Sequence, residues 1–171
     1  PVIDRRVRES HPLVSVIIST RSSADNFNRL IKCLAAQTVD DFEVIVADNM
    51  GIDIPAAAKK VHCVIPSLVD GNPTEGRNIA VHFARGQIAV FLDDNAVIGQ
   101  DYLANVVKAF ETTDILGLRG RILDQTGTVS HHQQAWDRGD QAFPTLCNQE
   151  CNAAFLIWSF RMVFGAYPLL N

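Results

Sequence analysis

The sequence predicts an α/β domain with a mostly parallel sheet, and two patterns support this prediction. Continuous apolar runs are typical of strands that are covered on both faces, as in parallel sheets. The candidate strands are Val14–Thr20, Phe42–Asn49, Val61–Ile65 and Ile88–Leu92. Helical patterns lie between and after these runs, and alternating strands and helices are typical of parallel α/β domains.

The helical patterns repeat apolar residues at the spacing of one helix face. They comprise Phe27, Leu30, Ile31 and Leu34, then Ala80, Phe83 and Ala84, and then Leu103, Val106, Val107 and Phe110. The apolar tail over residues 153–170 is interrupted by Ser159, Arg161, Gly165 and Pro168. We expect it to form a buried strand and a helix.

The run that begins at Ile88 ends abruptly in Asp93, Asp94 and Asn95. Ligands of open α/β sheets bind just beyond the carboxyl ends of the strands. Three oxygen-bearing side chains at such an end suit Mg²⁺ or Mn²⁺, with a phosphate ligand completing the coordination. The alternative is an Asp/Asn turn, because these side chains also hydrogen-bond to their own backbone.

Short motifs follow one another along most of the chain. They are Pro12–Thr20, Gln37-Thr38, Phe42–Asn49, Gly76–Ala80, Ala84–Gly86, Val90–Asn95, Cys151–Phe155 and Gly165–Tyr167. In this order they resemble a family 2 glycosyltransferase with the GT-A fold, the Rossmann-like fold of nucleotide-diphospho-sugar transferases. The resemblance covers about Leu13 to Tyr167. It implies sugar transfer from a nucleoside-diphosphate sugar, with a UDP-sugar favoured, to a hydroxyl of a glycan or lipid-linked acceptor of the cell-envelope type.

The resemblance also assigns roles to individual residues. It implies that Asp48 accepts a hydrogen bond from the base, and that Arg77 lies near the base and diphosphate. The alternative for Arg77 is a solvated charge at a helix start. Gly76 would let the backbone approach a ligand or strand closely. The expected nucleotide-sugar-binding residues are Thr20, Arg21, Asp48, Arg77, Asp93 and Asp94.

The expected metal ligands are Asp93, Asp94 and Asn95, which stand where the family has its Asp-x-Asp motif. The third position usually carries the metal-binding carboxylate, and this chain has Asn95 there. An amide oxygen coordinates Mg²⁺ or Mn²⁺ but adds no negative charge. We therefore expect weak metal binding that depends on the diphosphate.

The resemblance further implies a carboxylate base beyond Gly165–Tyr167, but residues 168–171 contain no acid. We therefore expect a chain truncated at its acceptor end, with little or no sugar transfer. Weak candidates for the base are Asp137, Asp140 and Glu150. One alternative function is a nucleotide-sugar-binding domain without turnover. A nucleotidyltransferase is disfavoured because residues 20–24 contain no glycine for a phosphate loop.

Length and charge narrow the class of protein. The chain has 171 residues and a net charge of −4, which suits one domain and argues against nucleic-acid binding. We expect a leader over residues 1–12, with dispersed basic groups at Arg5, Arg6, Arg8 and His11, and a single domain over 13–171. Residues 13–99 would form the nucleotide-binding half, and residues 100–171 a partial acceptor half.

Cysteine usage and hydropathy bear on the compartment. Cys33 and Cys63 lie in apolar patterns and are expected to be reduced core thiols. A zinc site at Cys147 and Cys151 is disfavoured, because structural zinc sites use tighter paired spacings. No apolar stretch approaches the ~20 residues of a membrane span. We expect a cytoplasmic location, with peripheral attachment to the inner face of the membrane as a further option.

Overall fold

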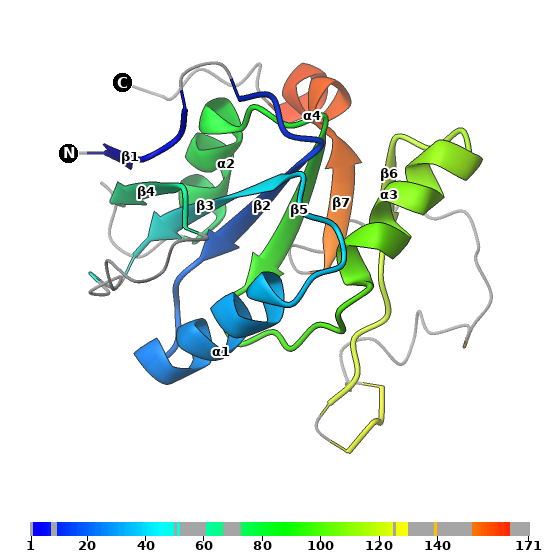
Figure 1. Ribbon diagram of the computed structural model, residues 1–171, viewed down its shortest axis with the longest axis horizontal. Helices are drawn as coiled ribbons and strands as arrows, with labels where there is room; N and C mark the ends of the chain where they lie inside the picture. The colour runs from blue at the N-terminus through cyan, green and yellow to red at the C-terminus, as the bar shows by residue number, and fades with distance from the viewer. Residues whose placement is uncertain are drawn as a thin grey trace.

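The computed structural model describes residues 2–7, 10–49, 51, 61–66, 73–124, 126–129, 139 and 152–164. The helices and strands form one layered α/β arrangement (Figure 1). The strands are β1 (Ile3–Asp4), β2 (Val14–Ser19), β3 (Phe42–Asp48), β4 (Cys63–Pro66), β5 (Ile88–Asp93), β6 (Gly117–Arg119) and β7 (Ala153–Leu156). The helices are α1 (Ala24–Ala35), α2 (Pro73–Phe83), α3 (Tyr102–Thr112) and α4 (Ile157–Phe164).

The sheet has the strand order β1-β4-β3-β2-β5-β7-β6. Its four central strands, β4, β3, β2 and β5, are parallel, whereas β1, β7 and β6 join the edges in antiparallel pairs. The four expected strands and the predicted fold class are therefore confirmed. The two short edge strands β1 and β6 were not expected.

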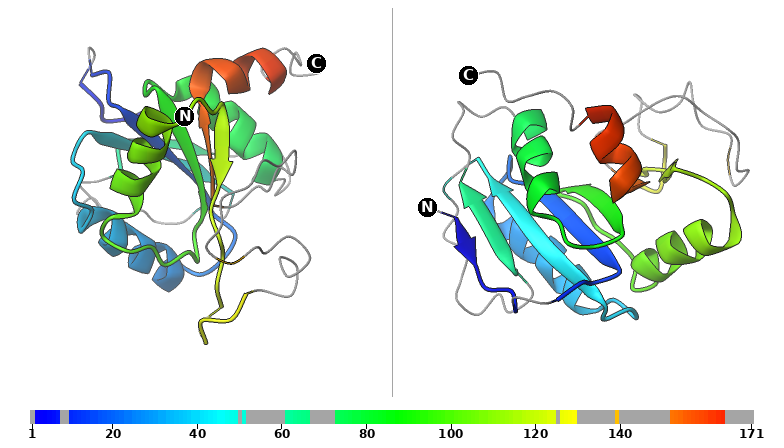
Figure 2. Two further views of the ribbon diagram at one scale, coloured as in Figure 1. Left: turned by 90° about the vertical axis from the view of Figure 1, so that its right-hand side faces the viewer. Right: turned by 90° about the horizontal axis from the view of Figure 1, so that it is seen from above.

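Helices cover both faces of the sheet (Figure 2). Side chains of α1 and α3 pack with Val16, Val46 and Leu92 on one face. Side chains of α2 and α4 pack with Ile17 and Ile45 on the other face. Both faces of each central strand are thus covered, which explains why these strands read as continuous apolar runs.

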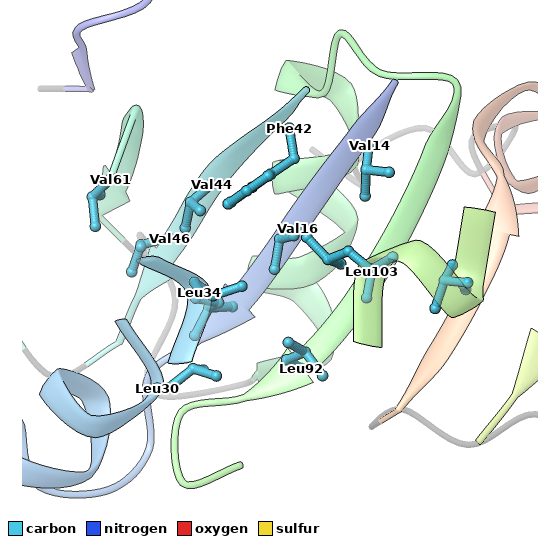
Figure 3. Packing of buried hydrophobic residues seen from close by; sticks show 14 of the residues in the cluster. Val14, Val16, Leu30, Leu34, Phe42, Val44, Val46, Val61, Leu92 and Leu103 are labelled. Carbon is cyan, nitrogen blue, oxygen red and sulfur yellow. The ribbon is translucent and has the colours of Figure 1, made fainter. Parts of the chain in front are cut away.

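The larger core cluster lies between the sheet and helices α1 and α3 (Figure 3). Phe27, Leu30 and Leu34 of α1 are fully buried there, as the helical spacing predicts. Ser23 precedes this helix, and its hydroxyl accepts a hydrogen bond from the Asn26 amide at 3.4 Å. Burying one large apolar side chain contributes about 1.5–3 kcal/mol, so this face provides much of the stability of the domain.

The segment before β2 differs from the expected leader. Ile3 and Asp4 pair with β4, and the side chain of Arg6 is only 4% exposed. The Arg6 guanidinium forms ion pairs with Asp4 at 2.6 Å and with buried Glu43 at 3.0 Å. Buried charges persist when they are paired, so this arginine fastens the segment to the amino-terminal end of β3.

Within the described residues, no helix has the length and apolar character needed to cross a membrane.

Candidate functional site

The carboxyl ends of β2, β3 and β5 lie side by side. Ser19 is the last residue of β2, and it is in register with Ala47 on one side and with Asp93 on the other. Asp48 ends β3 one residue later. The arrowheads of the three strands point to the same edge of the sheet (Figure 1). Asp48 and Asp93 are therefore brought to one edge, as predicted.

A hydrogen-bond network joins the ends of β2 and β3. The Thr20 hydroxyl donates to Asp48 Oδ1 at 2.9 Å and accepts from the Asn49 amide at 2.8 Å. Asn49 Nδ2 donates to Ser19 Oγ at 2.8 Å and to the Thr20 carbonyl at 3.2 Å. These bonds fix the orientation of the Asp48 carboxylate.

Helix α2 approaches this network closely at Gly76. A Cβ atom at this position would lie 3.2 Å from Ala47 Cβ and 3.3 Å from Asn49 Oδ1. Either distance is shorter than ordinary van der Waals contact between such atoms. The glycine therefore brings the start of α2 against the end of β3, in agreement with the expected close approach.

Arg77 follows Gly76 and forms an ion pair with Asp93. Its side chain is 5% exposed, whereas that of Asp93 is 33% exposed. Arg77 is thus a buried charge directed at the end of β5, and the alternative of a solvated charge at a helix start is wrong. The pair links α2 to the strand that carries the acidic motif.

Asp94 has different neighbours from Asp93. It is 1% exposed, and its Oδ2 atom accepts hydrogen bonds from the backbone amides of Arg21 and Ser22, both at 2.7 Å. A carboxylate that accepts two backbone hydrogen bonds holds the loop after β2 in place. The side chain of Arg21 remains exposed beside it.

The three expected metal ligands therefore differ in how available their oxygen atoms are to a metal ion. Asp94 Oδ2 is engaged by backbone amides, Asp93 is paired with Arg77, and Asn95 is exposed. Among the described residues, no three His, Cys, Asp or Glu side chains form a group that could hold a metal ion. The carboxylate of Asp93 and the amide of Asn95 are hard oxygen donors of the kind that Mg²⁺ and Mn²⁺ prefer, with other ligands coming from a substrate.

The two described cysteines are free thiols. Cys63 lies buried in β4, and its burial raises the pKa of the thiol to about 11. Cys33 in α1 is half-buried rather than fully inside the core. The other named candidates lie outside the described residues, and they are Asp137, Asp140, Glu150, Cys147 and Cys151.

Sequence reasoning missed a second network, which is centred on Asn152. Its backbone amide donates to the Phe91 carbonyl at 2.9 Å, and its Oδ1 accepts from the Tyr102 hydroxyl at 2.8 Å. The residue has a φ of 55°, a conformation that asparagine tolerates better than most residues. A single sequence does not indicate which asparagine adopts this conformation. The link between the start of β7 and the start of α3 is therefore visible only in the structure.

Comparisons with known proteins agree with this fold. The family model described as "Glycosyl transferase family 2" matches residues 15–166. An uncharacterized glycosyltransferase of Nostoc sp. (strain PCC 7120) is 27% identical over 143 residues, which are 80% of this chain and 41% of that protein.

Two solved structures have the same fold. The crystal structure of Staphylococcus aureus TarS 1–349 gives a TM-score of 0.72 at 21% identity, covering 88% of this chain and 48% of that chain. Mannosyltransferase PcManGT from Pyrobaculum calidifontis, in complex with GDP-Man and Mn²⁺, gives 0.67 at 19% identity, covering 91% and 48%. The chain thus spans less than half the length of each of these proteins.

Proposed function

Because the chain belongs to glycosyltransferase family 2, we propose that its sheet edge binds the nucleoside-diphosphate part of a sugar donor. The protein to which this domain belongs would then transfer the sugar to an acceptor hydroxyl. The observation that carries the proposal is that Asp48 and Asp93 lie at the carboxyl ends of β3 and β5, the two parallel strands on either side of β2. Such edges are where α/β folds bind ligands.

Each described residue has a distinct role in this proposal. Asp48 accepts a hydrogen bond from the base, and the Thr20 hydroxyl, at 2.9 Å, keeps its carboxylate in position. Arg77 supplies positive charge for the diphosphate. Asp94 shapes the loop that carries Arg21 rather than binding the ligand itself, because its Oδ2 accepts two backbone hydrogen bonds.

Asp93 and Asn95 would hold Mg²⁺ or Mn²⁺ together with diphosphate oxygens. When bound, such an ion neutralises the charge that develops on the leaving diphosphate. Within the acidic motif at the end of β5, the described residues offer one accessible carboxylate and one amide, which are too few donors for a complete shell. An Asn95→Asp variant should accordingly bind Mn²⁺ more tightly, because it adds a second negative charge.

The donor and acceptor are proposed by similarity. Another TarS 1–349 structure holds UDP-GlcNAc, and the mannosyltransferase structure holds GDP-Man and Mn²⁺. We favour a UDP-sugar as donor and a glycan or lipid-linked acceptor, with the domain on the cytoplasmic side of the membrane.

A thermal-shift panel of nucleoside diphosphates with Mn²⁺ tests the proposal, because a ligand that binds only the folded state raises the Tm. We expect UDP to raise the Tm more than GDP or dTDP do. Asp48→Ala should weaken UDP binding by about two- to thirteenfold, the effect of losing one hydrogen bond of ~0.5–1.5 kcal/mol. Asp114→Ala, an exposed control, should leave binding unchanged. No Tm shift with any nucleotide would contradict the proposed site.

A further inference from the structure

The Asp93 carboxylate, expected to bind a metal ion, already contacts a cation. The Arg77 guanidinium is paired with Asp93 Oδ1. Because the arginine side chain is 5% exposed, the pair is shielded from water on the arginine side. Separating a buried charge from an ion-pair partner is unfavourable, so the guanidinium stays at Asp93 unless another anion replaces that carboxylate.

A divalent ion at Asp93 would come close to this guanidinium. Two positive charges at one carboxylate repel each other, and the repulsion is stronger in a partly buried site than in water. We propose that Arg77 and the divalent cation compete for Asp93, and that the donor diphosphate removes this competition by binding the guanidinium in place of Asp93. This inference rests on the proposed function and concerns the same site.

The diphosphate suits this exchange because the arginine fork binds phosphate oxygens in bidentate fashion. The backbone of Arg77 is fixed in α2, since neighbouring Gly76 packs closely against Ala47 and Asn49. Only the arginine side chain therefore has to turn. Asp93 stays one-third exposed and becomes available to the ion.

The exchange makes Arg77 a residue that couples two ligands. A divalent ion without diphosphate must displace the guanidinium from Asp93, so it binds weakly. When the diphosphate is present it binds the guanidinium, and the ion then reaches Asp93 without having to displace that group. By thermodynamic linkage, UDP must raise the affinity for Mn²⁺ by the same factor as Mn²⁺ raises the affinity for UDP. Couplings of this kind typically amount to about 5–150-fold.

The test measures Mn²⁺ binding by electron paramagnetic resonance of the free ion, with and without UDP, on the 171-residue chain. In the native chain we expect UDP to strengthen Mn²⁺ binding about tenfold or more. In Arg77→Gln, Mn²⁺ alone should bind several-fold more tightly than to the native chain. The enhancement by UDP should be several-fold smaller than in the native chain, and what remains comes from the diphosphate oxygens that still coordinate the ion. Arg77→Lys, which keeps the positive charge, should lie between the two.

Lys32→Gln is the matched control, because it removes the same charge from an exposed position on α1. Its Mn²⁺ affinity and its enhancement by UDP should equal those of the native chain. Circular dichroism shows whether Arg77→Gln is folded. If it is not, Arg77→Met, which also removes the charge and keeps a long side chain, provides the same comparison.

Two results would overturn the inference. One is equal binding of Mn²⁺ alone to the native chain and to the folded variant that lacks the charge at position 77. The other is an enhancement by UDP that is as large in that variant as in the native chain. Failure of UDP to bind the native chain at all would instead contradict the proposed function, and the measurement with Mn²⁺ alone would still decide whether Arg77 competes for Asp93.

Discussion

Replacing Asp94 by alanine tests whether this buried acid is a structural support of the site. The change removes the acceptor of two backbone hydrogen bonds, each 2.7 Å long, from Arg21 and Ser22. Hydrogen bonds to a charged group contribute about 1.5–3 kcal/mol each, and two bonds that share one oxygen are not additive. We expect Asp94→Ala to lower the free energy of unfolding by about 2–5 kcal/mol.

Urea denaturation followed by circular dichroism measures this loss as a lower midpoint. Asp94→Asn should lose less stability than Asp94→Ala, because the asparagine amide oxygen can still accept the two hydrogen bonds although it carries no charge. Asp114→Ala, at an exposed position after α3, is the matched control and should change stability by less than about 0.5 kcal/mol. Equal stability of Asp94→Ala and the native chain would refute the reasoning.

Three further experiments, two with variants and one by alkylation, test other parts of the structure. Gly76→Ala places a Cβ 3.2 Å from Ala47 Cβ, so it should shift α2 and weaken UDP binding, which calorimetry measures. The pKa of Asp4 is lowered from 3.8 to about 2, mainly by its hydrogen bond with Arg6. This stabilisation is therefore complete above pH 3.8 and is lost as the pH falls towards 2, so Asp4→Asn should lose less stability than the native chain over that range in urea titrations. The Cys63 thiol, with its pKa raised to about 11 by burial, should resist iodoacetamide at pH 8 until the protein unfolds, as peptide mass mapping would measure.

The sequence predicted the central sheet because its strands are buried on both faces. Each strand core is a continuous apolar run, and the intervening helices show the helical spacing. The edge strands β1 and β6 have two and three residues, too few to show any periodicity. Their places are set by pairing with β4 and β7, which a single sequence does not reveal.

The acidic motif illustrates what a sequence cannot distinguish. In the sequence, Asp93 and Asp94 are two adjacent residues of the same type. In the structure, successive side chains at a strand end point to opposite sides. Asp93 therefore meets Arg77 from α2, and Asp94 meets the loop after β2. Residue type and position at the sheet edge were predictable, whereas the partners came from packing.

The same limit applies to the buried charge at the other end of the sheet. Arg6 reads as one of several dispersed basic groups, yet it pairs with Glu43, thirty-seven residues later in the chain. Glu43 also accepts a hydrogen bond from Ser15 at 2.6 Å. An acid inside an apolar strand pattern is the signal that could have suggested a buried partner.

The most direct test of the central claim locates the ligand on the sheet. Mn²⁺ with UDP broadens the NMR signals of nearby amides in the labelled chain. We predict that broadening is strongest at Ser19, Asn49 and Asp93, at the carboxyl ends of β2, β3 and β5, and becomes weaker along the strands towards Ser15 and Glu43 near the opposite ends. Broadening centred on Ser15 and Glu43, or none that depends on UDP, would contradict the account.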